Sequence, residues 1–144
     1  QELFGYVDDE GNPRDVKSQD VNAYLQEVTG QPFTAKDFRT WAGTVLAAQA
    51  LKEFEQFDSQ TQAKKNVVQA IENVAERLGN TKAVCRKCYV HPEILNSYLD
   101  GTLIQQLEMK AEREMRSLSK LPAEEAAVVA LLQQKLKRSR RRAA

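Results

Sequence analysis

Apolar residues recur at the spacing of α-helices along most of the chain. The first such stripe, at i, i+3, i+4 and i+7, consists of Val21, Tyr24, Leu25 and Val28. Ser18 or Asp20 can cap this helix at its start, and Gly30 stops it. The pattern therefore predicts one amphipathic helix that begins at Ser18 or Asp20 and stops at Gly30.

Two longer helices follow. The first opens with Thr34-Ala35-Lys36-Asp37, whose first and fourth residues form a capping box with Asp in place of the usual Glu. Its apolar face runs to a break at residues 58–59 and consists of Phe38, Trp41, Val45, Ala48, Leu51, Phe54 and Phe57. The second, over about residues 61–78, carries Val67, Ile71, Val74 and Leu78 before a Gly79-Asn80 cap.

The remainder of the chain also favours helices. Residues 81–90 form a short block ended by His91-Pro92, and residues 93–117 have a helical pattern with Gly101 as a possible break. A last helix starts at Leu121-Pro122, with Pro in its first turn.

The one strand signal is the apolar run 3–7, followed by turn formers at residues 8–13, which indicates the end of a strand or hairpin that started upstream. The sequence thus predicts a mainly α fold: a compact multi-helix domain with a short strand or hairpin remnant at the N-terminus.

Length and composition fit a single soluble domain. The chain has 144 residues, 42% hydrophobic and 28% charged. The longest apolar run, 126–132, is far shorter than the ~20 residues of a membrane span, so we expect no membrane-crossing segment. The chain starts Gln1-Glu2-Leu3, with neither an initiator Met nor a leader, so we expect a fragment of a longer protein.

Basic residues are concentrated in two places although the net charge is only +1. Residues 135–142 hold six of the 21 Lys and Arg and no acid, and a smaller basic island extends from Arg77 to Lys87. Such patches can bind a polyanion, but a terminal basic run is equally typical of a solubilising tail. We therefore divide the chain into a helical domain, 1–134, and a basic tail, 135–144.

Cys85 and Cys88 form a C-x-x-C pair, the spacing of a redox centre or of half a zinc site. A redox centre needs a βαβ context, which is absent, and four zinc ligands cannot come from two Cys and one His, His91. We predict two reduced thiols and no metal. The six scattered glycines form no phosphate-binding loop, and His91 has no orienting carboxylate beside it, so we interpret it as a loop residue.

Tyr89 is surrounded by cations. Arg86, Lys87 and Lys82 precede it by three, two and seven residues, and no carboxylate lies within three residues of it. A free phenol loses its proton only near pH ~10, so it becomes a nucleophile where cations favour the phenolate and stabilise the negative charge that develops. A phosphodiester under attack develops such a charge.

Arg39 is a candidate partner for that reaction, because a guanidinium binds two phosphate oxygens at once. It lies near a helix N-terminus, one turn after Lys36, where backbone N–H groups also favour anions. Spacing alone leaves open a structural alternative, in which Tyr89 only packs and Arg39 pairs with a carboxylate.

Two blocks of sequence resemble a known family. Residues 34–44, TAKDFRTWAGT, and residues 80–92, NTKAVCRKCYVHP, resemble the catalytic core of the bacterial, poxvirus-like type IB DNA topoisomerases. The blocks occur in the family's order and separation, and residues 6–11 and 20–30 are also similar. The resemblance covers most of the chain, more weakly after about residue 110.

The resemblance implies a role for each matching residue. Tyr89 would attack a DNA phosphodiester to give a 3′-phosphotyrosyl enzyme and a 5′-hydroxyl strand, whose rotation relaxes supercoils before religation. Arg39 would bind the non-bridging oxygens, and Lys36 would support it. Members often have a His nine residues before the tyrosine; here that position is Asn80, which can donate a hydrogen bond but no proton.

The resemblance also implies how the enzyme works and where. No ATP, metal or other cofactor is needed, because the covalent intermediate keeps the bond energy. The substrate is double-stranded DNA, contacted by Lys82, Arg86 and Lys87, and the enzyme is a monomer on the bacterial nucleoid in the cytoplasm.

Two expected residues are missing. The family's catalytic set includes a further Arg and a general-acid Lys on a β-hairpin, and no motif in residues 1–33 resembles either. We therefore expect the fragment alone to be nearly inactive. Two alternatives stay open: a tyrosine recombinase, which shares the fold core and the phosphotyrosyl intermediate, and a non-catalytic helical DNA-binding module.

Overall fold

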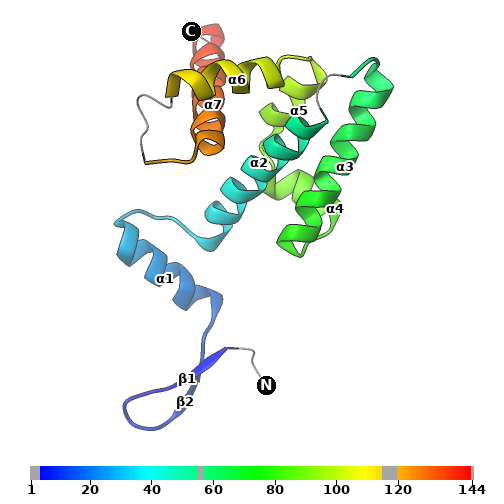
Figure 1. Ribbon diagram of the computed structural model, residues 1–144. Helices are drawn as coiled ribbons and strands as arrows, with labels where there is room; N and C mark the ends of the chain where they lie inside the picture. The colour runs from blue at the N-terminus through cyan, green and yellow to red at the C-terminus, as the bar shows by residue number, and fades with distance from the viewer. Residues whose placement is uncertain (1–3, 55–56, 115–119, 144) are drawn as a thin grey trace. The chain divides into compact units, whose positions relative to one another are not determined.

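The computed structural model describes residues 4–54, 57–114 and 120–143, and it is mainly helical, as the sequence predicts (Figure 1). The chain forms two compact units, Gln1–Arg39 and Thr40–Ala144. The elements are β1 (Gly5–Val7), β2 (Pro13–Asp15), α1 (Ser18–Thr29), α2 (Ala35–Glu53), α3 (Gln60–Leu78), α4 (Lys82–Val84), the π-helical turn η1 (Cys85–Tyr89), α5 (Pro92–Leu99), α6 (Leu103–Glu114) and α7 (Ala123–Ala143).

The first unit begins with an antiparallel hairpin of β1 and β2, in which Tyr6 faces Arg14. The Asp8 carboxylate organises the turn, accepting the backbone N–H of Asn12 at 2.9 Å and the Arg14 Nε at 2.9 Å. These bonds lower the pKa of Asp8 below its usual value, the Asn12 N–H contributing most. Among the described residues, the strand that pairs with the predicted one is thus β2, which follows the turn in sequence.

Helix α1 follows, where the sequence predicted it. Gly30 ends it in the left-handed conformation, φ 62°, with its N–H bonded to the Gln26 carbonyl. The cap differs from both predicted residues: Lys17 occupies the N-cap position, and the Asp20 carboxylate accepts the Lys17 backbone N–H at 2.7 Å. None of the residues of α1 is buried, and Tyr24 and Val28 are each 64% exposed. The predicted apolar face exists but does not enter a core.

The predicted capping box at the start of α2 is confirmed in one half. The Asp37 carboxylate accepts both the backbone N–H and the hydroxyl of Thr34, each at 2.8 Å. The Thr34 hydroxyl thus donates to Asp37, whereas in a complete box it would accept the N–H of residue 37. Ala35 N–H is satisfied by the Asn22 side chain of α1 at 3.0 Å.

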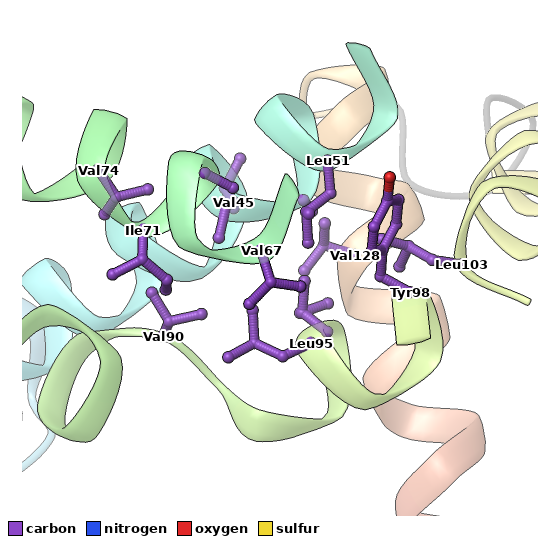
Figure 2. Packing of buried hydrophobic residues seen from close by; sticks show 14 of the residues in the cluster. Val45, Leu51, Val67, Ile71, Val74, Val90, Leu95, Tyr98, Leu103 and Val128 are labelled. Atoms are coloured by element: carbon purple, nitrogen blue, oxygen red, sulfur yellow. The ribbon is translucent and has the colours of Figure 1, made fainter. Parts of the chain in front are cut away.

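The core lies in the second unit, between one face each of α2, α3, α5, α6 and α7 (Figure 2). Leu51, Ile94 and Leu131 are fully buried there, and Val90 is 4% exposed. A polar contact is enclosed with them: Asn66 donates to the Tyr98 hydroxyl at 2.7 Å. Buried polar groups cost little when they are paired in this way.

The boundaries of the later helices follow local breaks. The second predicted helix ends at Glu53, before the predicted break at 58–59; residues 55–56 lie outside the described part of the chain. Gly101, with φ 75°, separates α5 from α6, so the possible break is real. Pro122 immediately precedes α7 and accepts the Ala126 N–H.

Helix α7 continues through the basic run to Ala143. Residues 135–143 are therefore helical, and no change of secondary structure marks the proposed division at residue 134. No helix in the described ranges is long and apolar enough to span a bilayer.

The hydrogen bonds between Thr34 and Asp37 at the start of α2 can be tested by titrating the Asp37 carboxyl group. Hydrogen bonds from the Thr34 hydroxyl and then the Thr34 N–H lower the pKa of Asp37 below its ordinary 3.8. Because the charged form is favoured in the fold, the stabilisation is present above the unfolded pKa and is lost as pH falls through the folded pKa. In Thr34→Val, NMR titration should find the Asp37 pKa raised toward 3.8.

Thr29→Val is the matched control, because the Thr29 hydroxyl bonds to the Leu25 carbonyl and to no carboxylate. It should leave the Asp37 pKa unchanged. Equal Asp37 pKa values in the wild type and Thr34→Val would contradict the hydroxyl bond.

Candidate active site

Tyr89 is the last residue of the π-helical turn η1. The turn is closed by a bond from the Val90 N–H to the Cys85 carbonyl at 3.1 Å, an i to i−5 pairing. Cys85 is fully buried, whereas Tyr89 is half-buried against the core. The turn is thus fixed at its start by the core, and such π-turns occur frequently at functional sites.

One face of α2 holds the backbone around Tyr89. The Thr40 hydroxyl donates to the Cys88 carbonyl at 3.3 Å, and the Thr44 hydroxyl donates to the Tyr89 carbonyl at 3.4 Å. The Thr44 oxygen also accepts the backbone N–H of His91 at 3.1 Å. Since Thr44 is only 2% exposed, these bonds form away from competing water. The backbone on both sides of Tyr89 is therefore positioned by α2.

Gly43 lies between these two threonines and allows the close approach. A Cβ at this position would lie 2.6 Å from the Tyr89 carbonyl oxygen and 3.2 Å from the Tyr89 Cβ. Any larger residue would push the segment of Tyr89 away from α2. The sequence places residues 40, 43 and 44 on one helical face, but it does not reveal what that face contacts, so their positioning role is found only in the structure.

The predicted cations near Tyr89 differ in their surroundings. Arg86 and Lys87 are exposed on η1. Lys82, the first residue of α4, pairs with Glu72 of α3 at 2.7 Å, with side chains 55% and 38% exposed. Exposed ion pairs are weak, so a phosphate can compete with Glu72 for this ammonium.

Asn80 follows the Gly79 cap of α3 and is half-buried. Its side-chain Nδ2 donates to the Leu78 carbonyl at 3.0 Å. The amide carries two hydrogens, and this bond uses one of them.

Lys36 and Arg39 lie on α2 in the first unit. Lys36 is exposed in the first turn of the helix, and Arg39 is half-buried one turn later. The next residue of the helix is Thr40, which bonds to the segment of Tyr89.

The two cysteines of this segment are free thiols, Cys85 buried and Cys88 half-buried. Within the described ranges, no three His, Cys, Asp or Glu side chains gather as a metal site would require. The second unit thus presents the phenol of Tyr89 on a fixed backbone, with the cations Arg86 and Lys87 on the same turn.

Comparison with known proteins gives two matches. Residues 1–118 match the family described as eukaryotic DNA topoisomerase I, catalytic core. A protein named DNA topoisomerase 1B from Acanthamoeba polyphaga mimivirus is 36% identical over 103 residues, covering 67% of this chain and 31% of the viral protein. The chain thus spans about a third of the length of this relative.

The contact at Gly43 predicts that replacing this helix glycine by alanine lowers the free energy of unfolding, although the same change usually raises it. In a free helix position Gly→Ala stabilises by about 0.5–1 kcal/mol. Gly43→Ala should instead destabilise by about 1–3 kcal/mol, because the new methyl group overlaps the Tyr89 carbonyl. Urea unfolding followed by circular dichroism measures the difference.

Ala42→Gly, at the preceding position of α2, is the control and should destabilise by about 1 kcal/mol through helix propensity alone. A stabilising effect of Gly43→Ala, opposite in sign to this control, would show that α2 and the Tyr89 segment are not in close contact.

Proposed function

Because the chain belongs to the family of the eukaryotic DNA topoisomerase I catalytic core, we propose that it carries the nucleophile of a type IB DNA topoisomerase. The observation that carries the proposal is the position of Tyr89, whose backbone is held by Thr44 and Gly43 at the end of a turn that exposes Arg86 and Lys87. This arrangement suits a nucleophile that attacks a polyanion, because the backbone that carries the phenol is fixed and the neighbouring exposed charges are positive.

In the proposed reaction the Tyr89 hydroxyl loses its proton and its oxygen attacks the phosphorus of one DNA strand. The new bond joins Tyr89 to the 3′-phosphate, and the bond to the 5′-oxygen breaks, with that oxygen gaining a proton to leave as a 5′-hydroxyl. Rotation of the free strand relaxes supercoils, and the 5′-hydroxyl then attacks the phosphotyrosine to restore both original bonds. The phosphoryl bond is exchanged and not hydrolysed, so the cycle consumes no ATP.

Other residues receive proposed roles from the sequence resemblance. Arg39 binds the non-bridging oxygens in the transition state, and Lys36 supports it or contacts an adjacent phosphate. Asn80 donates a neutral hydrogen bond to a phosphate oxygen. Lys82, Arg86 and Lys87 bind phosphates of the DNA duplex.

We propose further that the protein is a bacterial, poxvirus-like member and that this chain is its C-terminal catalytic region. We also propose that it acts as a monomer on nucleoid DNA in the cytoplasm. The support is the resemblance of residues 34–44 and 80–92 to that group.

The nucleophile can be tested without the absent general acid. A DNA substrate with sulfur in place of the 5′-bridging oxygen releases a thiolate, which needs no proton donor in order to leave. We expect the chain to form a covalent adduct with this substrate and Tyr89→Phe to form none while still binding the DNA. Denaturing gels detect the adduct, and mass spectrometry of peptides locates it.

Tyr24→Phe is the matched control, because Tyr24 is an exposed tyrosine of α1, and it should form as much adduct as the wild type. An adduct that persists in Tyr89→Phe would assign the reaction to another residue. Binding without any adduct in the wild type would favour the non-catalytic module.

A second test uses ordinary supercoiled plasmid. We expect this 144-residue chain to relax it at least ~10²-fold more slowly than an intact type IB enzyme, since loss of a general acid alone costs ~10²- to 10⁴-fold. Time courses on agarose gels give the rates. Relaxation at a full-length enzyme's rate would show that residues 1–144 contain the whole catalytic set.

A further inference from the structure

A cavity of about 640 Å³ lies in the second unit between the start and end of α5 and the basic part of α7. Its polar lining residues are His91, Glu93, Asp100, Lys135, Arg138 and Ser139. The volume is that of a typical small-ligand site. The cavity therefore brings His91 and the basic run, both left without an assigned role by the sequence, to one place.

His91 presents one defined hydrogen-bond donor. Its backbone N–H is bonded to Thr44, and its ring Nδ1 accepts the Glu93 backbone N–H at 3.2 Å. In the neutral imidazole the proton then sits on Nε2, since Nδ1 is the acceptor. The ring is fixed by these bonds two residues after Tyr89, in a segment of extended backbone.

The opposite wall comes from α7. Lys135 and Arg138 are three residues apart and so lie on one face of the helix. Lys135 pairs with Glu93, with its Nζ 3.8 Å from the carboxylate. Within the described part of the chain, Arg138 has no ion-pair partner. Of the two acidic residues of the lining, Glu93 faces Lys135. Asp100 keeps its negative charge, and its Oδ1 accepts the N–H and hydroxyl of Thr102 at the start of α6.

Three donors of the cavity have no hydrogen-bond or ion-pair partner among the described residues: the His91 Nε2–H, the Arg138 guanidinium and the Ser139 hydroxyl. A phosphodiester offers the acceptor oxygens and negative charge that such a set binds. We propose that this cavity binds a backbone phosphate of the DNA strand close to the phosphate that Tyr89 attacks. The inference rests on the proposed function. It makes the basic part of α7 a DNA-binding element held beside the nucleophile's segment, and not a free tail.

The test is non-covalent binding of a short fluorescent duplex by the 144-residue chain, followed by anisotropy over a range of salt concentrations. All variants carry Tyr89→Phe, so that no covalent adduct enters the measurement. Arg138→Gln should reduce the slope of log affinity against log salt by about 0.9, the value of one phosphate contact. Arg141→Gln removes the same charge from α7 outside the cavity, and it should reduce the slope by less than half as much.

His91→Asn tests the neutral donor. Asn is also a good N-cap, so the start of α5 is retained while the Nε2–H is lost. We expect affinity to fall about tenfold with the slope unchanged, because a hydrogen bond and no charge is removed. Circular dichroism confirms that each variant keeps its helices.

Equal slopes in Arg138→Gln and Arg141→Gln would overturn the proposal and return the basic run to non-specific attraction. Wild-type affinity in His91→Asn would also overturn it. Failure here is distinguishable from failure of the proposed function, because adduct formation is measured separately. If the wild-type chain forms no adduct but Arg138→Gln reduces the salt slope, the phosphate site is supported and the proposed function is not. If the adduct forms but Arg138→Gln leaves the slope unchanged, only the phosphate site is overturned.

Discussion

The approach of α2 to the backbone of Tyr89 is the contact on which the rest of the site depends. Gly43 provides the space and Thr44 the hydrogen bonds, one to the Tyr89 carbonyl and one from the His91 N–H. A buried hydroxyl that both donates and accepts fixes its neighbours more firmly than packing alone, because displacing either group leaves a polar atom unpaired. Tyr89 ends a short helical turn, and its backbone is held there by the side of α2 as well as by the turn's own bond.

The same helix connects the segment of Tyr89 to the C-terminal part of the chain. Trp41, next to Thr40, donates its indole N–H to Glu125 of α7 at 2.9 Å, and Lys110 of α6 donates to the Ala130 carbonyl at 2.8 Å. Ala127, Val128 and Leu131 bury α7 in the common core. Because α7 is one continuous helix, burial of its first half fixes the direction in which its basic second half extends.

The net charge of +1 therefore describes no single region of the molecule. In the second unit, two of the basic side chains form ion pairs: Lys82 pairs with Glu72, and Lys135 pairs with Glu93. Arg86 and Lys87 remain exposed on the π-turn. Within that turn Cys85 faces the core while the two cations face solvent.

The sequence by itself predicted helices over most of the second unit, the apolar faces of α2 and α3, the Gly79 cap and the Gly101 break, because helical periodicity and caps are local properties. It also showed a phenol, Tyr89, with the cations Arg86 and Lys87 beside it, since residue type fixes which groups are present. It placed Val21, Tyr24 and Val28 on one face of a helix, but it could not show that they are exposed, because burial depends on what packs against the helix. The contacts of Gly43 and Thr44 with the Tyr89 segment, and the place of His91 and Arg138 in one cavity, were decided only by the tertiary structure. Each of these pairings joins residues more than 40 positions apart in the sequence. Helical periodicity predicts which residues share a face, but what packs against that face is known only from the folded structure.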